Sequence, residues 1–162
     1  MNQQELSHTL RKEIIRQGRS VQIFASGYSM FPFLRKGDLL TVEPVPMETI
    51  KRGDIVVFEI GEKWIAHRVI RVSRVKNRIE LSLRGDSCVA YDPVVNEENY
   101  IGAVIKFQRR NSIRNLDSTK LNFWKKNITG FGLLYNLPIY CARIFVGFIL
   151  SPFLKRNVIQ QS

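Results

Sequence analysis

The sequence is poor in cysteine and histidine, with only two of each among 162 residues. Two cysteines, Cys88 and Cys141, are too few for a disulfide framework, and we expect both to be buried or lipid-facing thiols. With His8 and His67 they do not form a ligand cluster, so no metal site is expected. The first residues, 1–5, are polar, and we therefore expect neither a cleavable signal nor an N-terminal membrane anchor.

Acidic residues are scarce in the last third of the sequence. Residues 109–162 contain nine basic residues and one acidic residue, a net charge of +8, whereas 21–108 contain 12 and 11, a net charge of +1. The whole chain carries 25 basic and 14 acidic residues, hence +11. The basic excess flanks an apolar stretch, residues 128–154, which is unusual for a nucleic-acid-binding tail. This pattern favours anionic membrane lipid as a partner over nucleic acid.

Residues 21–107 contain short runs rich in β-branched and aromatic side chains, separated by turns. Three turns repeat a basic residue, glycine and aspartate, at 36–38, 52–54 and 84–86. We therefore predict a mainly β fold, with a short N-terminal helix over 2–17 and a C-terminal hydrophobic helix. The predicted strands cover residues 21–24, 39–42, 54–59, 63–72, 79–83 and 100–107.

Composition divides the chain into five parts. The predicted boundaries are 1–20 for the N-terminal helix, 21–108 for a β domain, 109–127 for a basic linker, 128–154 for a hydrophobic membrane-associated segment and 155–162 for a tail.

The hydrophobic segment has three possible placements. Its 27 residues exceed the roughly 20 that a spanning helix needs, but Arg143 near its middle costs about 3 kcal/mol there. An in-plane helix with a narrow polar stripe through Asn136 and Arg143, or a segment docked on the protein itself, stays open. If the segment spans, the basic residues before it outnumber those after it, which leaves the β domain in the cytoplasm. We expect membrane association, with the side of the membrane left open.

The residues that carry chemistry lie in two segments. The first, Ser26-Gly27-Tyr28-Ser29-Met30-Phe31-Pro32, places Ser29 after a glycine-containing turn from which a hydroxyl can project. The second places His67 in a strand-like run, and a neutral histidine can accept the proton of a nucleophilic serine near neutral pH. Lys63 shares a strand face with His67 and is the less favoured base. The alternatives are a turn serine and a buried core histidine. Together the two segments suggest a serine peptidase.

These motifs resemble the signal peptidase I family and its relatives, the self-cleaving repressors. The resemblance covers residues 21–107 and also rests on the second and third Gly-Asp turns and on Ile101-Gly102. It implies a mainly β catalytic domain in which Ser29 is the nucleophile. His67 stands where the microsomal and archaeal enzymes carry histidine. An aspartate then orients this histidine, and Asp92 matches the family's offset better than Asp86, which we expect to hold its turn together.

The resemblance also implies the rest of the active site. The backbone N–H of Ser29 is expected in the oxyanion hole, and the Ser26 hydroxyl is a second candidate. A substrate cleft walled by Met30, Phe31 and Pro32 is expected, although core packing explains these three side chains equally well. No cofactor is expected, because a serine–histidine mechanism needs none.

The sequence supports three functions. The first is a membrane-associated serine endopeptidase that cleaves signal or leader peptides of protein precursors after small side chains. The second is a cytoplasmic-face peptidase for one dedicated peptide precursor, because ordinary signal peptidases are anchored N-terminally and work on the outer face. The third is a non-enzymatic β module on anionic membrane. A repressor is disfavoured, because a helix-turn-helix does not fit within residues 1–20. Partner subunits are not predicted.

Overall fold

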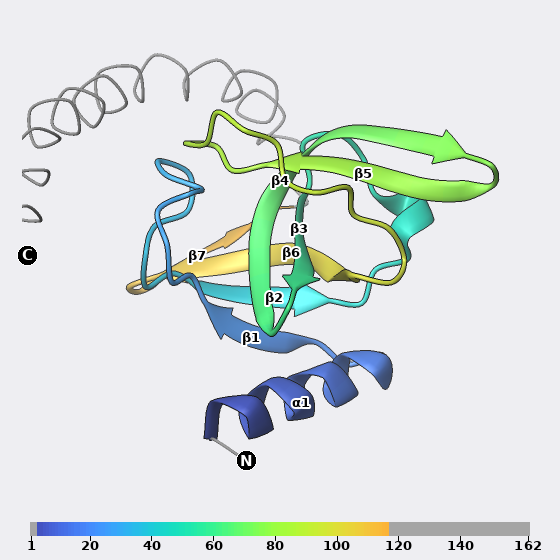
Figure 1. The fold of residues 1–162 in the computed structure, drawn as a ribbon. Coiled ribbons are helices and arrows are strands. Elements are labelled where there is room, and N and C mark those ends of the chain that lie inside the picture. Colours follow the sequence, from blue (N-terminus) through green and yellow to red (C-terminus); the bar gives the residue numbers. More distant parts are fainter. Residues whose placement is uncertain (1–2, 117–162) are drawn as a thin grey trace, which may run out of the picture.

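The structure, a computed structural model, describes residues 3–116 and consists mainly of antiparallel β strands (Figure 1). The predicted fold class is confirmed: a mainly β domain with one short N-terminal helix. The predicted C-terminal hydrophobic helix, the tail and Cys141 lie outside the described residues. The elements are α1 (Gln3–Arg16), β1 (Val21–Phe24), β2 (Leu39–Glu43), the 3-10 helix η1 (Met47–Thr49), β3 (Ile55–Ile60), β4 (Lys63–Val75), β5 (Arg78–Arg84), β6 (Tyr100–Arg109) and β7 (Ser112–Asn115).

The sheet is longer than the sequence predicts. Its strand order is β1-β2-β6-β3-β4-β5, and β7 pairs with β6. β6 runs to Arg109, one residue past the predicted boundary at 108, and β7 lies within residues 109–127, where the sequence predicts a basic linker. All four residues of β7 are exposed, so this strand lacks the apolar alternation that reveals a strand in a sequence. A two-residue turn, with Arg110 at a φ of 52°, joins the two strands.

Two hydrophobic cores lie on opposite sides of β3. Ile55 and Val57 pack into the first core, whereas Val56 and Phe58 pack into the second. All four side chains are at most 3% exposed, which explains their unbroken apolar run: a strand covered on both faces has no polar side. Each such burial contributes roughly 1.5–3 kcal/mol. β3 is therefore the shared centre of the domain.

The long strand β4 serves two parts of the sheet. Its first half, Lys63–Arg68, pairs with β3, and its second half, Arg68–Val75, pairs with β5. The register shifts between Val69 and Arg71, and from there the β4–β5 hairpin projects from the body (Figure 1). His67 therefore lies just before the point where β4 changes partners.

Helix α1 packs beside the β3–β4 hairpin. Its residue Ile15 is buried in the first core, and Lys12 forms an ion pair with Glu59 of β3. The His8 ring packs edge-on against Trp64 of β4, with ring centroids 5.5 Å apart. Within residues 3–116, no helix is both long and apolar enough to cross a membrane.

Candidate active site

Ser29 lies in the loop between β1 and β2, and the sequence around it explains its position. Ala25 exchanges backbone hydrogen bonds with Gly37 and Asp38, which close the base of the loop. Met30 and Leu34 are buried in the first core, so they anchor the loop from inside. The half-buried serine between these fixed points is held in place rather than left on a free loop.

His67 joins Ser29 to Asp92 through two hydrogen bonds. The imidazole is 7% exposed and lies 6.0 Å from the Phe58 ring. Ser29 Oγ is 2.8 Å from His67 Nε2, and His67 Nδ1 is 2.6 Å from Asp92 Oδ2. Because a carboxylate only accepts, Nδ1–H donates to Asp92, and Nε2 of the neutral ring then accepts from the serine hydroxyl. The Asp92 N–H donates to the Leu83 carbonyl, which fixes the loop to β5.

The turn after β5 holds the backbone of Ser29 through hydrogen bonds. The Ser87 N–H and hydroxyl both donate to the Ser29 carbonyl, at 2.8 and 3.0 Å, and this hydroxyl also lies 2.8 Å from the Tyr28 carbonyl. Gly85 packs so closely that a Cβ there would lie 2.6 Å from Ser29 O and 3.1 Å from His67 Nε2. The glycine therefore provides the space in which serine and histidine meet.

Asp86 does not orient His67. Its carboxylate accepts two 2.7 Å hydrogen bonds from Arg68, and both side chains are almost completely buried. Arg68 also donates to the Gly53 carbonyl and lies over the Phe33 ring, 4.8 Å from its centroid. Successive strand residues point to opposite faces, so β4 directs His67 to the serine and Arg68 to the turn that carries Gly85. The expectation that Asp86 holds its turn together fits this geometry.

The first Gly-Asp turn is held by a more exposed arginine. Arg109 donates two hydrogen bonds to the Asp38 carboxylate, at 2.8 and 2.6 Å, and one to the Phe33 carbonyl. The Arg35 N–H also donates to this carboxylate. Burial acts to raise the pKa of Asp38, but the hydrogen bonds and positive charge of Arg109 and the Arg35 N–H outweigh it, so the pKa is lowered.

A cavity of about 320 Å³ opens beside Ser29 and His67. It contains no charged side chain: its wall comes from β1, the loop after it, Leu34, Leu40 and β4. The residues lining it are Ile23, Phe24, Ala25, Ser26, Gly27, Ser29, Met30, Leu34, Leu40, Trp64, Ile65, Ala66 and His67.

The three residues predicted to wall the substrate cleft differ in where they lie. Met30 lines the cavity, and so does exposed Ser26. Phe31 and Pro32, which were expected in a cleft wall, do not line this cavity. The reason is the tight loop: hydrogen bonds from Phe31 N–H to Tyr28 O and from Leu34 N–H to Met30 O turn the chain away, and Pro32 is left exposed.

Two hydrogen-bond donors at the cavity have no acceptor within residues 3–116. They are the backbone N–H of Ser29 and the hydroxyl of Ser26.

Cys88 is another nucleophilic side chain nearby, but burial, reinforced by the Asp92 carboxylate, raises the pKa of its thiol. A thiol with a raised pKa stays protonated and is a poor nucleophile, so Ser29 is the favoured one.

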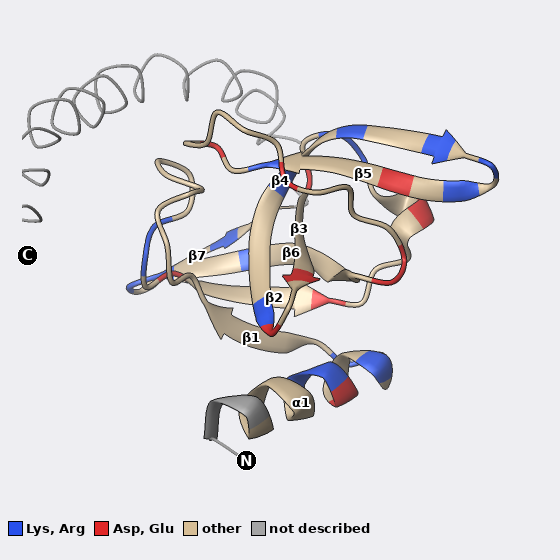
Figure 2. Cartoon of the chain, viewed as in Figure 1, with Lys and Arg blue, Asp and Glu red and all other residues tan. Residues whose placement is uncertain are grey.

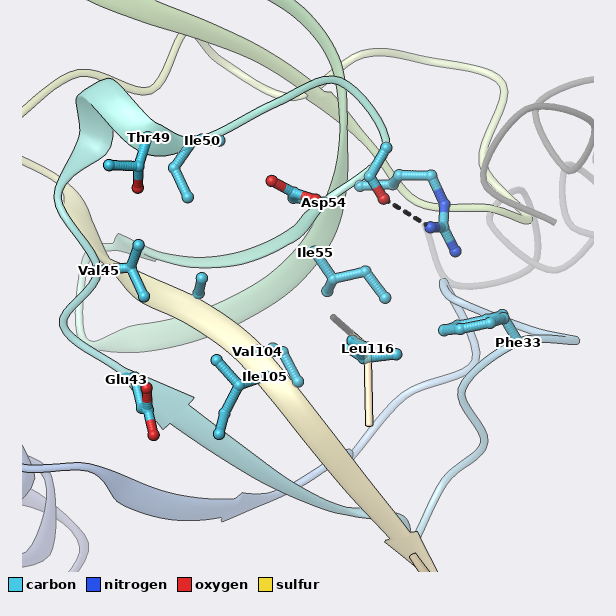
Figure 3. Close-up of a pocket in the computed structure, with 13 residues that line it drawn as sticks. Phe33, Glu43, Val45, Thr49, Ile50, Asp54, Ile55, Val104, Ile105 and Leu116 are labelled. Atoms are coloured by element: carbon cyan, nitrogen blue, oxygen red, sulfur yellow. Dashed lines mark hydrogen bonds between the residues drawn. The ribbon is translucent and has the colours of Figure 1, made fainter. Parts of the chain in front are cut away.

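A second cavity, of about 350 Å³, lies between β6 and the segment that leads into β3 (Figure 3). Phe33, Ile55, Val104 and Leu116 contribute apolar wall, and the side chains of Glu43 and Asp54 also line it. None of the three residues of the Ser29–His67–Asp92 chain lines this cavity. It is therefore separate from the candidate active site.

Comparison with protein families agrees with this geometry. Residues 2–101 match the family model described as Peptidase S24-like. The chain belongs to the Peptidase S24-like family. This confirms the predicted superfamily, which signal peptidases and self-cleaving repressors share, but the match does not single out signal peptidase I. No curated protein matches the chain.

The S24-like domain contains three site residues that the sequence did not reveal. Gly85 and Ser87 contact Ser29 across more than 50 positions of sequence, and Arg68 holds their turn from the far face of β4. The repeated Gly-Asp motif marked the turn that contains Gly85, but nothing in the motif distinguishes it from the two turns that lie elsewhere.

Proposed function

We propose that this S24-like chain is a serine endopeptidase in which Ser29 is the nucleophile, His67 the general base and Asp92 the group that orients the histidine. The observation that carries the proposal is the continuous hydrogen-bonded chain from Ser29 Oγ through His67 to Asp92. This is the geometry of serine–histidine–aspartate catalysis, which is recognised by distances and roles rather than by order in the sequence.

In the proposed mechanism, Ser29 Oγ attacks the substrate carbonyl while His67 Nε2 takes its proton. Asp92 accepts from Nδ1–H throughout and stabilises the imidazolium that forms. The backbone N–H of Ser29 donates to the developing oxyanion. His67 then gives its proton to the leaving amine, and water, activated by the same nitrogen, releases the acyl group from Ser29.

The substrate is proposed to bind as an extended strand. The outer edge of β1 has no strand partner within residues 3–116, and neither has the edge of β4 from Lys63 to His67, where β5 has not yet begun to pair. Both strands line the cavity. A peptide inserted between them would satisfy the backbone groups of both edges.

The uncharged cavity supports an apolar residue beside the scissile bond. Signal or leader peptides of protein precursors, cleaved after small side chains, fit this requirement. The basic and hydrophobic composition of residues 109–162 supports attachment to anionic membrane as part of the same proposal.

The decisive experiment is cleavage of a panel of signal- and leader-containing precursors by the purified full chain in detergent and in liposomes. Ser29→Ala and His67→Ala should each reduce cleavage at least a thousandfold with an unchanged melting temperature. Ser112→Ala is the matched control, because it removes a hydroxyl from the exposed strand β7, away from the cavity, and it should stay within twofold of wild type. A fluorophosphonate probe should label the wild type and not Ser29→Ala. Residual cleavage within tenfold of wild type in either triad variant would disprove the mechanism.

Self-cleavage is the second candidate, because the family match places the chain in the superfamily of self-cleaving repressors. Within residues 3–116, most of the chain before Ser29 is in α1 and β1, and β1 forms the cavity wall. This favours a separate substrate. Self-cleavage would appear as loss of full-length wild type with a first-order rate that does not depend on protein concentration.

A further inference from the structure

A third cavity, lined by Asp92, lies on the side of His67 that faces this carboxylate. Its volume is about 880 Å³, and three exposed cations line it: Lys51, Arg52 and Arg71. We call it the basic hollow. Asp92 also lines it, so the hollow begins one imidazole ring and two hydrogen bonds from Ser29 Oγ.

The charges of the basic hollow are not neutralised within residues 3–116. No ion pair joins Lys51, Arg52 or Arg71 to a described carboxylate, and the one acidic lining residue, Asp92, already accepts from His67. Residues 21–108 carry a net charge of only +1, so this concentration of positive charge is local. Three like charges around one hollow repel one another, and an anion bound between them would be attracted to all three.

The shape and the apolar part of the basic hollow favour a peptide. Tyr91 and Val94 are 58% and 54% exposed there, and Ile50, Ile70 and Val72 add further apolar lining. A concave surface that combines aliphatic side chains with three cations matches a peptide bearing aliphatic and carboxylate groups. A flat bilayer would not fill the hollow. The basic colouring in Figure 2 continues along β4 to the tip of the β4–β5 hairpin, which supplies a control region outside the hollow.

We propose that the basic hollow binds an acidic segment of the peptide substrate, on the side of the scissile bond remote from the uncharged cavity. The inference rests on the proposed peptidase function, whose active site it extends. The substrate then presents an apolar residue to one side of His67 and carboxylates to the other. Lys51, Arg52 and Arg71 select the substrate in this arrangement and take no part in the bond cleavage.

The test measures binding without cleavage. A fluorescein-labelled peptide of six glutamates is titrated by fluorescence anisotropy with the full chain carrying Ser29→Ala, in detergent at low salt, beside a peptide of six glutamines. The glutamate peptide should bind at least tenfold more tightly, and added salt should weaken it. K51Q/R52Q/R71Q should lower its affinity about tenfold or more. R74Q/K76Q/R78Q, which removes the same charge from the hairpin tip, should change it less than threefold.

Three results would overturn the proposal. The first is equal affinity for the two peptides, and the second is an equal loss in both triple variants, since that would reflect net charge alone. The third is a loss of binding to phosphatidylglycerol vesicles in K51Q/R52Q/R71Q without a loss for the glutamate peptide, which would assign the hollow to lipid. Because binding is measured in the Ser29→Ala protein, an inactive peptidase leaves the outcome readable.

Discussion

Two turns with nearly the same sequence, Lys36-Gly37-Asp38 and Arg84-Gly85-Asp86, use their glycines for different reasons. Gly37 has a φ of 90°, which other residues adopt only at a cost, and a Cβ there would meet nothing within 4 Å. A Cβ on Gly85 would instead collide with Ser29 O at 2.6 Å. One glycine serves conformation and the other serves space, so a repeated motif does not imply a repeated role.

The aspartates of the two turns differ in the same way. Asp86 is bound to Arg68 in a pair that is almost completely buried, whereas the partner of Asp38, Arg109, is 28% exposed. The buried Asp86–Arg68 pair holds the turn that contacts Ser29. The more exposed Asp38–Arg109 pair holds the base of the loop that carries Ser29. Substitutions in the turn at 36–38 should therefore affect stability alone. Substitutions in the turn at 84–86 should affect activity as well.

The largest difference between the two turns is expected when a methyl group is added to each glycine. Gly85→Ala should lower kcat/KM about a hundredfold, because Ser29 or His67 has to move by a large part of an ångström. Gly37→Ala should leave kcat/KM within twofold and cost about 1–2 kcal/mol of unfolding free energy. Kinetics on a cleaved precursor and denaturant unfolding measure the two. Equal activity losses would remove the distinction.

Replacing Arg68 or Arg109 compares how much stability each arginine gives to its partner carboxylate, Asp86 or Asp38. Arg68→Gln should lower the free energy of unfolding by about 3–5 kcal/mol, because Asp86 is left buried and unpaired. Arg109→Gln should cost about 1–2 kcal/mol, since Asp38 keeps the Arg35 N–H and its partner was partly in water. The double variant Arg68→Met with Asp86→Leu should recover most of the first loss. If it does not, the pair contributes more than mutual neutralisation.

Ser87→Ala tests how strongly the turn after β5 positions Ser29. The variant loses the hydroxyl bonds to Tyr28 O and Ser29 O but keeps the backbone bond to Ser29 O. Activity should fall about tenfold, in line with about 1 kcal/mol for such a bond. Ser112→Ala, on exposed β7, is the control and should have no effect. A drop in kcat without a rise in KM would identify positioning rather than substrate binding.

The smallest effect depends on pH. Because the folded-state pKa of Asp38 is lowered from its ordinary 3.8, the unfolded chain takes up a proton first as the pH falls. The stability from this carboxylate is present above pH 3.8 and is lost as the pH falls through the folded value. The cost of Asp38→Asn, measured by urea unfolding, should therefore shrink between pH 6 and pH 3. If the loss of unfolding free energy in Asp38→Asn does not change with pH, packing rather than charge explains it.

The three candidate residues were predicted from two different sources. Ser29 and His67 were identified from their own segments, whereas Asp92 was implied by the resemblance to signal peptidases, and the three side chains lie together in the structure. What the sequence did not reveal is of two physical kinds. Whether Phe31 meets the cavity depends on how tightly its loop turns, and the bracing of Ser29 by Ser87 joins residues 58 positions apart. Neither leaves a periodic signal in the chain.

The strand β3 has a consequence for how the domain opens. Since Val56 and Val57 point into different cores, neither core can come apart without releasing the strand that holds the other. The backbone amides of β3 should therefore exchange with solvent only when the entire domain unfolds, as one cooperative unit. A domain built this way has no independently melting half, so Ser29 and His67, which lie on elements on either side of β3 in the sheet, are brought together or separated only with the whole fold.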